Sequence, residues 1–194
     1  MTNRAVFLDR DGTLNEAPAP GYLSDPESVR LMPHVGSVLH QLKDLYNFKL
    51  IVVSNQSGIA RGLITIDEVN KVNEKINTLL REFHVCIDQF YFCPYHPDFN
   101  NQEECKCRKP SAQMVLLAAQ DHNIDLTRSF IIGDSASDIE CGMNAGLRTI
   151  LILSGHGRET LYSLQKQNKI PSFVAGNFLE AGNMIINDLN GELN

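Results

Sequence analysis

Two aspartates, Asp9 and Asp11, stand two residues apart at the end of a short apolar run, residues 5–8. If the extended geometry of a strand continues to Asp11, both carboxylates project to the same side. Two such charges repel, which favours a bound cation or a shared proton, and Mg²⁺ is commonly held by carboxylates together with phosphate oxygens. One carboxylate could then attack phosphorus while the other acts as general acid and base, with Thr13 holding the loop by side-chain hydrogen bonds. The alternative is an Asp-rich turn.

A second acidic pair follows a later apolar run, residues 130–133. Asp134 comes directly after this run, and Asp138 lies four residues further, on the same face if a helix begins near Ser135. One or both could complete a Mg²⁺ site with Asp9. For Asp138 alone, the alternative is a first-turn acid that caps the helix and favours its dipole.

Two more polar pairs suit a phosphorylated substrate. Ser54 and Asn55 follow another apolar run and offer a hydroxyl and an amide to phosphate oxygens, although this signal is weak on its own. Arg108 and Lys109 precede a helical pattern, where cations are electrostatically unfavourable, so they indicate an anion nearby rather than a solvated basic pair. Lys109 near Asp9 would offset the repulsion between an anionic nucleophile and phosphate, and the planar fork of Arg108 could bind phosphate.

A cysteine-rich segment lies just before Arg108. Cys93, His96, Cys105 and Cys107 form the Cys₃His set that is typical of a closed structural Zn²⁺ site. The alternative is a redox pair, but the segment has no C-x-x-C spacing, and C-x-C is strained for an internal disulfide. The chain has five cysteines, and a reducing compartment disfavours structural disulfides. Residues 93–107 are therefore predicted to form a zinc loop.

The elements that must position these residues alternate along the chain. Apolar runs at residues 5–8, 49–53, 130–133 and 149–153 are expected to be strands buried on both faces. Helical patterns lie between them, one of them opened by a capping box from Thr65 to Glu68. This order predicts an α/β fold with a doubly wound, mainly parallel sheet and ligands beyond the carboxyl ends of its strands.

Length and composition limit the possible classes. The 194 residues are 43% hydrophobic and 21% charged, which predicts one globular domain over residues 1–194 without a large cap domain. The formal net charge of −6 gives no electrostatic case for nucleic acid or a membrane surface as partner. The N-terminal apolar run is too short for a signal peptide or a spanning helix, so we expect a cytoplasmic protein, and we expect it to be a monomer.

In combination, these motifs resemble those of the haloacid dehalogenase superfamily of phosphatases. The matching set is D-x-D-G-T from Asp9 to Thr13, then Ser54 and Asn55, then Lys109, then G-D-x-x-x-D ending at Asp138. The resemblance implies an Asp9 nucleophile that forms an aspartyl-phosphate and an Asp11 acid/base. It also implies Mg²⁺ held by Asp9, the Asp11 backbone carbonyl and Asp134, with Ser54 and Lys109 orienting the phosphoryl group.

A narrower resemblance adds the segments GYL, SNQSGIARG, YFCPYHP and CKCRKP. Together they are similar to the D-glycero-D-manno-heptose 1,7-bisphosphate phosphatases and the related histidinol-phosphate phosphatases, a subgroup with a small zinc loop. In that subgroup the ligand histidine usually occupies the position of Tyr95, and here His96 follows it. The resemblance implies removal of the 7-phosphate of the heptose bisphosphate during synthesis of nucleotide-activated heptose, with the histidinol-phosphate reaction as the alternative.

Two other interpretations remain open at this point. A phosphoacceptor signalling domain also uses a doubly wound sheet, an Asp cluster, a Ser or Thr and a Lys, but it would place the phosphoacceptor on a central strand near the middle of the chain. It would also need no cysteine loop. A DNA-end phosphatase of the same superfamily is disfavoured by the acidic net charge.

Overall fold

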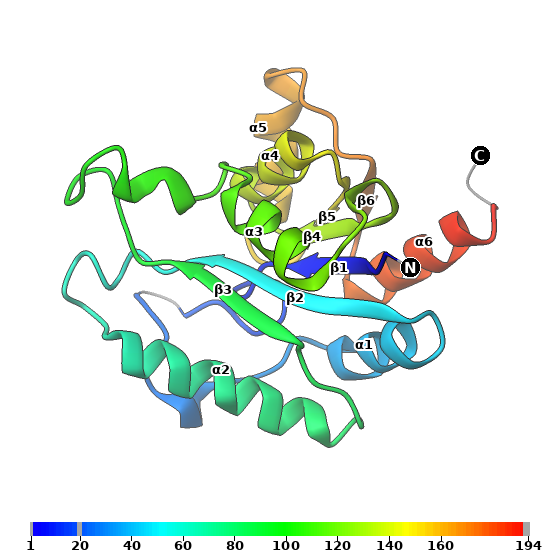
Figure 1. Cartoon of the computed structure of the whole chain (residues 1–194), viewed down its shortest axis with the longest axis horizontal. Helices are drawn as coiled ribbons and strands as arrows, with labels where there is room; N and C mark the ends of the chain where they lie inside the picture. The colour runs from blue at the N-terminus through cyan, green and yellow to red at the C-terminus, as the bar shows by residue number, and fades with distance from the viewer. Residues whose placement is uncertain (1, 19–20, 192–194) are drawn as a thin grey trace.

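The computed structural model describes residues 2–18 and 21–191, and these form a six-stranded sheet with helices on both faces (Figure 1). All adjacent strands pair in parallel, in the order β3-β2-β1-β4-β5-β6. The strands are β1 (Arg4–Leu8), β2 (Phe48–Asn55), β3 (Gln89–Cys93), β4 (Phe130–Gly133), β5 (Arg148–Ile152) and β6 (Phe173–Ala175). The predicted doubly wound α/β fold is therefore confirmed.

The described ranges also contain six α-helices and three short 3₁₀ turns, and all of them except the last helix lie between strands in the chain. The helices are α1 (Val35–Asp44), α2 (Ile66–Arg81), α3 (Gln113–His122), α4 (Ala136–Ala145), α5 (Gly157–Lys166) and α6 (Phe178–Leu189). The 3₁₀ turns are η1 (Pro26–Ser28), η2 (Glu104–Cys107) and η3 (Leu126–Arg128). The helical pattern expected after Arg108 and Lys109 is α3, which begins at Gln113. Within residues 2–18 and 21–191, no helix has the length and apolarity that a bilayer crossing requires.

The central strand β1 shows why the sheet is buried on both faces. Val6 and Leu8 point into a core formed with α1, α2 and α6, whereas Ala5 and Phe7 point into a second core formed with α3 and α4. In Figure 1 these two groups of helices lie on opposite sides of the sheet. Since successive side chains of a strand alternate between faces, a continuous apolar run is what two covered faces require.

The helix α2 begins as its sequence predicts. The Thr65 hydroxyl accepts from the backbone N–H of Glu68 at 3.2 Å, and the Glu68 carboxylate accepts from the backbone N–H of Thr65 at 2.7 Å. This reciprocal capping box is confirmed, and it fixes the start of the helix that covers the sheet beside β2 and β3.

The strand order reverses direction between β1 and β4. After β1 the chain builds β2 and β3 on one side of it, then returns to place β4, β5 and β6 on the other side. The backbone N–H of Asp9 donates to the carbonyl of Ile132 at 3.0 Å, so the segments that follow β1 and β4 leave the sheet together. In doubly wound sheets such a switch point forms a crevice at the carboxyl ends of the strands, where ligands bind.

Candidate active site

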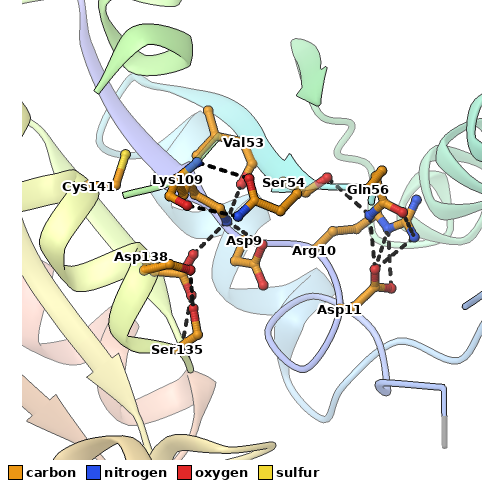
Figure 2. Close-up of polar contacts among 12 residues, drawn as sticks. Asp9, Arg10, Asp11, Val53, Ser54, Gln56, Lys109, Ser135, Asp138 and Cys141 are labelled. Carbon is orange, nitrogen blue, oxygen red and sulfur yellow. Dashed lines mark hydrogen bonds and ion pairs between the residues drawn. The ribbon is translucent and has the colours of Figure 1, made fainter. Parts of the chain in front are cut away.

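Three side chains from distant parts of the sequence meet at this switch point (Figure 2). The Lys109 ammonium lies 2.6 Å from Asp9 Oδ1 and 2.5 Å from Asp138 Oδ1, and it also donates to the carbonyl of Val53 at 2.7 Å. The Lys109 side chain is 2% exposed, that of Asp138 is fully buried and that of Asp9 is 13% exposed. A buried lysine is thus shared by two carboxylates, of which only Asp9 reaches solvent.

Backbone contacts fix the position of Lys109. The side-chain amide of Asn55, at the end of β2, accepts from the Lys109 N–H at 3.0 Å and donates to the Lys109 carbonyl at 3.1 Å. Asn55 was predicted to contact phosphate, but the structure directs its amide to this backbone instead. Asn55 therefore holds Lys109 against the end of β2.

Asp138 serves the start of α4 and the lysine at once. One of its carboxylate oxygens accepts from the backbone N–H of Ser135 at 3.0 Å and from the Ser135 hydroxyl at 2.6 Å, which forms a capping box. The other oxygen binds Lys109. Asp138 therefore caps α4 and contacts the buried lysine at the same time.

Burial and the neighbouring charges shift the pKa values of Asp9 and Lys109. Burial, reinforced by repulsion from Asp138, raises the pKa of Asp9 from 3.8 to about 7, although Lys109 opposes this shift. Burial alone would lower the pKa of Lys109, but the charges of Asp138 and Asp9 raise it above its ordinary value. Lys109 is therefore a fixed positive charge, whereas Asp9 is only partly ionised near neutral pH unless more positive charge is supplied nearby.

Carboxylate oxygens of Asp9, Asp134 and Asp138 lie within 4.8 Å of one another and are suited to holding a cation. Space for such an ion is kept open by glycines, because a Cβ added to Gly12 or Gly155 would come within 2.5 Å or 2.1 Å of Asp134 Oδ2. Both glycines also have positive φ angles, +90° and +54°. The donor set is all oxygen, which fits Mg²⁺.

Asp134 is positioned by the segment after β5. The backbone N–H of His156 donates to Asp134 Oδ2 at 2.9 Å, and the exposed His156 ring lies 3.5 Å from the same oxygen. Burial raises the pKa of Asp134 despite the His156 contact, and repulsion from Asp138 adds to the shift. The contact of His156 with Asp134 was not predicted, because neither spacing nor residue type links His156 to the loop after β4.

Asp11 does not face Asp9, contrary to the expectation of a continued strand. The strand β1 ends at Leu8, and the Asp11 carboxylate turns toward the Arg10 guanidinium, with Arg10 Nη2 to Asp11 Oδ2 at 2.8 Å (Figure 2). Asn15 Nδ2 donates to the other oxygen at 2.9 Å. Burial would raise the pKa of Asp11, but Arg10 and the hydrogen bonds together lower it below its ordinary value.

Thr13 was predicted to hold this loop through its side chain, and the structure corrects that interpretation. Its hydroxyl is buried and has no hydrogen-bond partner among the described residues. The loop is held instead by backbone bonds, from Gly12 N to the Asn15 carbonyl at 2.8 Å and from Leu14 N to the Arg10 carbonyl at 2.9 Å.

Ser54 and Gln56 link the loop after β2 to Asp11. Ser54, 3% exposed, accepts at its Oγ from Gln56 Nε2 at 3.2 Å, and the same Nε2 donates to Asp11 Oδ2 at 3.1 Å. Arg10 and Gln56 were not predicted as site residues. Each stands inside a recognised motif, but the contacts of Arg10 with Asn73 and of Gln56 with Asp11 join different segments and so leave no local signal.

Arg108 directly precedes Lys109 and lies near Tyr22. It is half-buried and donates to the Tyr95 carbonyl at 3.3 Å, and burial lowers the pKa of its guanidinium. The Tyr22 hydroxyl lies 3.3 Å from Ser57 Oγ, and the ring of Tyr22 fills the space where a Cβ on Gly58 would be, 2.7 Å away. The segment before η1 is thus docked onto the loop after β2.

The cysteine segment differs from the predicted zinc loop. Cys93, at the end of β3, is disulfide-bonded to Cys107, with their Cα atoms 5.5 Å apart, and Cys105 is a free thiol. His96 Nε2 faces Arg61 at 3.0 Å, and its Nδ1 faces the Asp98 N–H at 3.2 Å. The four predicted ligands are therefore not gathered around one point in this structure.

Comparisons with known proteins agree with the fold. Residues 106–181 match a family model described as HAD-hydrolase-like. A D-glycero-D-manno-heptose-1,7-bisphosphate 7-phosphatase of Chlorobaculum tepidum is 37% identical over 187 residues, 92% of each chain. A D-glycero-beta-D-manno-heptose-1,7-bisphosphate 7-phosphatase of Helicobacter pylori strain J99 is 39% identical over 163 residues, 84% of this chain and 90% of that one. A crystal structure of the D,D-heptose 1,7-bisphosphate phosphatase of B. bronchiseptica, complexed with magnesium and phosphate, superposes with a TM-score of 0.83 at 26% identity and covers 95% of this chain and 99% of that chain.

Proposed function

The chain belongs to the D-glycero-D-manno-heptose-1,7-bisphosphate 7-phosphatase family of HAD-like hydrolases, and on this basis we propose that it removes the 7-phosphate of that heptose bisphosphate. It is a phosphoric monoester hydrolase. The observation that carries the proposal is the contact of Lys109 with Asp9 and Asp138 at the switch point between β1 and β4.

Asp9 is proposed as the nucleophile. Its carboxylate is the member of the buried cluster that reaches solvent, so an oxygen of Asp9 can attack phosphorus while the bond from phosphorus to the sugar oxygen breaks. Water then hydrolyses the aspartyl-phosphate, releases inorganic phosphate and restores the carboxylate. Lys109 and Ser54 are proposed to stabilise and orient the phosphoryl oxygens during both steps.

Mg²⁺ is proposed as the catalytic cofactor, held by Asp9 and Asp134. When bound, it would supply the positive charge that offsets the repulsion between the carboxylates and the phosphate. Asp138 belongs to the same group of carboxylates, but its contacts with Lys109 and Ser135 favour a supporting role. The Asp11 backbone carbonyl completes the proposed set.

Asp11 is proposed to protonate the leaving sugar oxygen and then to accept a proton from the attacking water. In the structure its carboxylate is bound by Arg10, Asn15 and Gln56. It must therefore turn from these contacts toward the phosphoryl group during the reaction.

The rest of the sugar substrate is proposed to lie over the segment before η1. A polar hollow of about 350 Å³ is lined there by Glu16, Tyr22 and Asp25, among others. Arg108, on the same side of the site, is proposed to bind the phosphate that the reaction leaves in place. The heptose substrate is favoured over histidinol phosphate because the relatives described above carry the heptose name.

For the cysteine segment we keep the prediction of a structural Zn²⁺ site in the reduced protein. It is supported by the convergence of Cys93 and Cys107, which join the end of β3 to the residue before Arg108. A shared metal ion would join the same two points. His96 and Cys105 would have to turn toward this pair to complete the set.

The remaining proposals concern partners and location. We propose a single domain that acts as a cytoplasmic monomer on a phosphorylated sugar, without nucleic acid or membrane partners. The formal net charge of −6 supports the part of this proposal that concerns partners, because it gives no net electrostatic attraction to nucleic acid or an anionic membrane. The product would serve the synthesis of nucleotide-activated heptose.

A side-by-side kinetic comparison tests the substrate. Phosphate release is measured with Mg²⁺ on D-glycero-D-manno-heptose 1,7-bisphosphate and on histidinol phosphate, with Asp9→Asn as the control for contaminating phosphatase. We expect the kcat/KM for the heptose bisphosphate to be higher by at least about tenfold, because only this substrate offers a second phosphate to Arg108. Phosphorus NMR of the product should show that the phosphate at C1 remains. Equal or greater efficiency with histidinol phosphate would overturn the proposal.

A further inference from the structure

Arg10 is a buried cation whose guanidinium donates to polar side chains of the site and of α2. It is 1% exposed, and its guanidinium donates to both carboxylate oxygens of Asp11 at 2.8 to 3.2 Å. On its other side Nη1 donates to Asn73 Oδ1 at 3.3 Å. Asn73 lies in α2, so the helix that covers the sheet anchors the guanidinium. Its planar geometry then leaves the Asp11 carboxylate one matching orientation.

Gln56 connects this pair to the phosphate end of the site. Arg10 Nη2 donates to Gln56 Oε1 at 3.1 Å, and because a guanidinium can only donate, this contact fixes which end of the amide is oxygen. The amide nitrogen then faces the other way, where it donates to Asp11 and to Ser54 Oγ. This leaves the Ser54 hydroxyl proton to donate to a phosphoryl oxygen.

Backbone bonds close the turn after β1, from Gly12 N to the Asn15 carbonyl and from Leu14 N to the Arg10 carbonyl. In addition to these bonds, the contacts of Arg10 and Gln56 set the direction of the Asp11 side chain, which is 26% exposed. If these contacts only stabilised the loop, the Gln56 amide would not need to link Asp11 to Ser54.

We propose that Arg10 and Gln56 are positioning residues that couple Ser54, which orients the phosphoryl group, to Asp11, which transfers the proton to the leaving oxygen. The inference rests on the function proposed above. When a phosphoryl group binds at Ser54, the Gln56 amide that is shared between Ser54 and Asp11 is displaced or redirected, and Asp11 turns toward the leaving oxygen. Arg10, held by Asn73, limits this rotation so that the carboxylate enters the site from one side. Figure 2 shows the connected contacts from Ser54 through Gln56 and Arg10 to Asp11.

The experiment compares two leaving groups in the Mg²⁺-loaded enzyme. A sugar alkoxide needs a proton as it leaves, whereas p-nitrophenolate leaves without one, so only the first substrate depends on a correctly placed Asp11 in the step that forms the aspartyl-phosphate. Hydrolysis of the aspartyl-phosphate is the same for both substrates. The comparison therefore uses kcat/KM, which covers the steps up to the departure of the leaving group. We expect Arg10→Met to lower kcat/KM by about tenfold or more for the heptose bisphosphate and by less than about threefold for p-nitrophenyl phosphate. In an Asp11→Asn background, Arg10→Met should change kcat/KM by less than about twofold, because the side chain that it positions is gone.

Controls separate this role from general stability. Arg4→Met removes a partly buried arginine at the start of β1, the end of the strand away from Asp9, where it contacts the Tyr46 carbonyl. It should leave the ratio of kcat/KM for the two substrates unchanged. Gln56→Leu breaks the connection to Ser54 while leaving the Arg10 and Asp11 pair, and it carries the test if Arg10→Met does not fold. Equal losses on both substrates, or an added loss in the Asp11→Asn background, would overturn the inference. Full activity of Asp11→Asn on the bisphosphate would instead sink the acid/base assignment itself.

Discussion

The ammonium of Lys109 lies 2.5 Å from the carboxylate of Asp138, and both side chains are almost completely buried although they are 29 residues apart in the chain. This pair joins the segment after η2 to the first turn of α4, and Lys109 also contacts Asp9. Both carboxylate oxygens of Asp138 are bound, because the oxygen that does not contact Lys109 accepts from Ser135 and caps the helix. The pair therefore connects helix stability, lysine placement and nucleophile electrostatics.

Removing the lysine should cost both stability and activity. Lys109→Met would leave Asp138 charged and buried without its partner, and breaking a buried ion pair in this way typically costs about 3–5 kcal/mol. We expect a clearly lower melting temperature and loss of phosphate release. Lys106→Met is the matched control, because Lys106 forms an exposed pair with Glu103 that is worth less than about 1 kcal/mol. A Lys109→Met protein as stable as the wild type would contradict the importance of this pair.

Asp9→Asn should remove turnover while leaving the fold intact. The amide keeps the shape of the side chain but is a poor nucleophile, and removing a nucleophile commonly costs several orders of magnitude in kcat. The measurement is phosphate release, with circular dichroism to check folding. Retained turnover at wild-type level would exclude Asp9 as the nucleophile.

The same carboxyl makes the stability of the metal-free protein depend on pH. Its pKa rises from 3.8 to about 7 on folding, so between these values the folded state holds a proton that the unfolded state has lost. The free energy of unfolding should therefore fall as the pH rises from about 4 to about 7, by a few kcal/mol at most. Thermal melts in a chelator at several pH values measure this slope.

Two additions make this pH test specific. Mg²⁺ should raise the melting temperature more at pH 8 than at pH 5, because it binds the ionised carboxylates. Asp9→Asn should show a shallower slope and a smaller Mg²⁺ effect, because the amide that replaces the carboxyl group does not titrate. If the free energy of unfolding of the wild type instead rises over this pH range, and that of Asp9→Asn does not, the raised pKa of Asp9 is refuted.

The sequence predicted the parts of the fold whose signal is local. The apolar run at residues 130–133 is strand β4 in full, and the capping box at Thr65 begins α2, because buried strands and helix caps each depend on a few adjacent residues. The edge strands were not predicted. β3, Gln89–Cys93, has only one buried residue, and β6, Phe173–Ala175, has three residues, so neither has the continuous apolar pattern of a central strand.

In the candidate site, too, some positions follow from local sequence and others depend on contacts between distant segments. The positions of Asp9 and Asp134 follow from strands that end at one edge of the sheet, so the sequence could place them together. The direction of the Asp11 carboxylate could not be predicted, because it depends on Arg10, which is in turn held by Asn73 and Gln56 from other segments. Asn55 shows the same limit. Its amide suits phosphate by type, yet the backbone of Lys109 uses it.

The cysteine segment offers the last prediction. Whether a metal ion or a disulfide joins Cys93 to Cys107, it fixes the residue that precedes Arg108, so Cys107→Ser should loosen the segment that carries Arg108 and Lys109. We expect a lower melting temperature and a higher KM for the heptose bisphosphate, with a smaller effect on kcat, because Asn55 still holds Lys109. Cys86→Ser, at an exposed thiol elsewhere, is the control and should change neither.

Metal analysis and thiol counting decide which bond is present. Protein purified with a reductant is expected to carry about one zinc per chain, as a closed Cys₃His site would. Cys107→Ser and Cys105→Ser should then each lower the zinc content, whereas Cys86→Ser should not. If the reduced wild-type protein contains no zinc, the prediction of a metal site is wrong. Protection of Cys93 and Cys107 from alkylation before reduction, with Cys105 reactive, would show instead that the disulfide of the structure holds this segment.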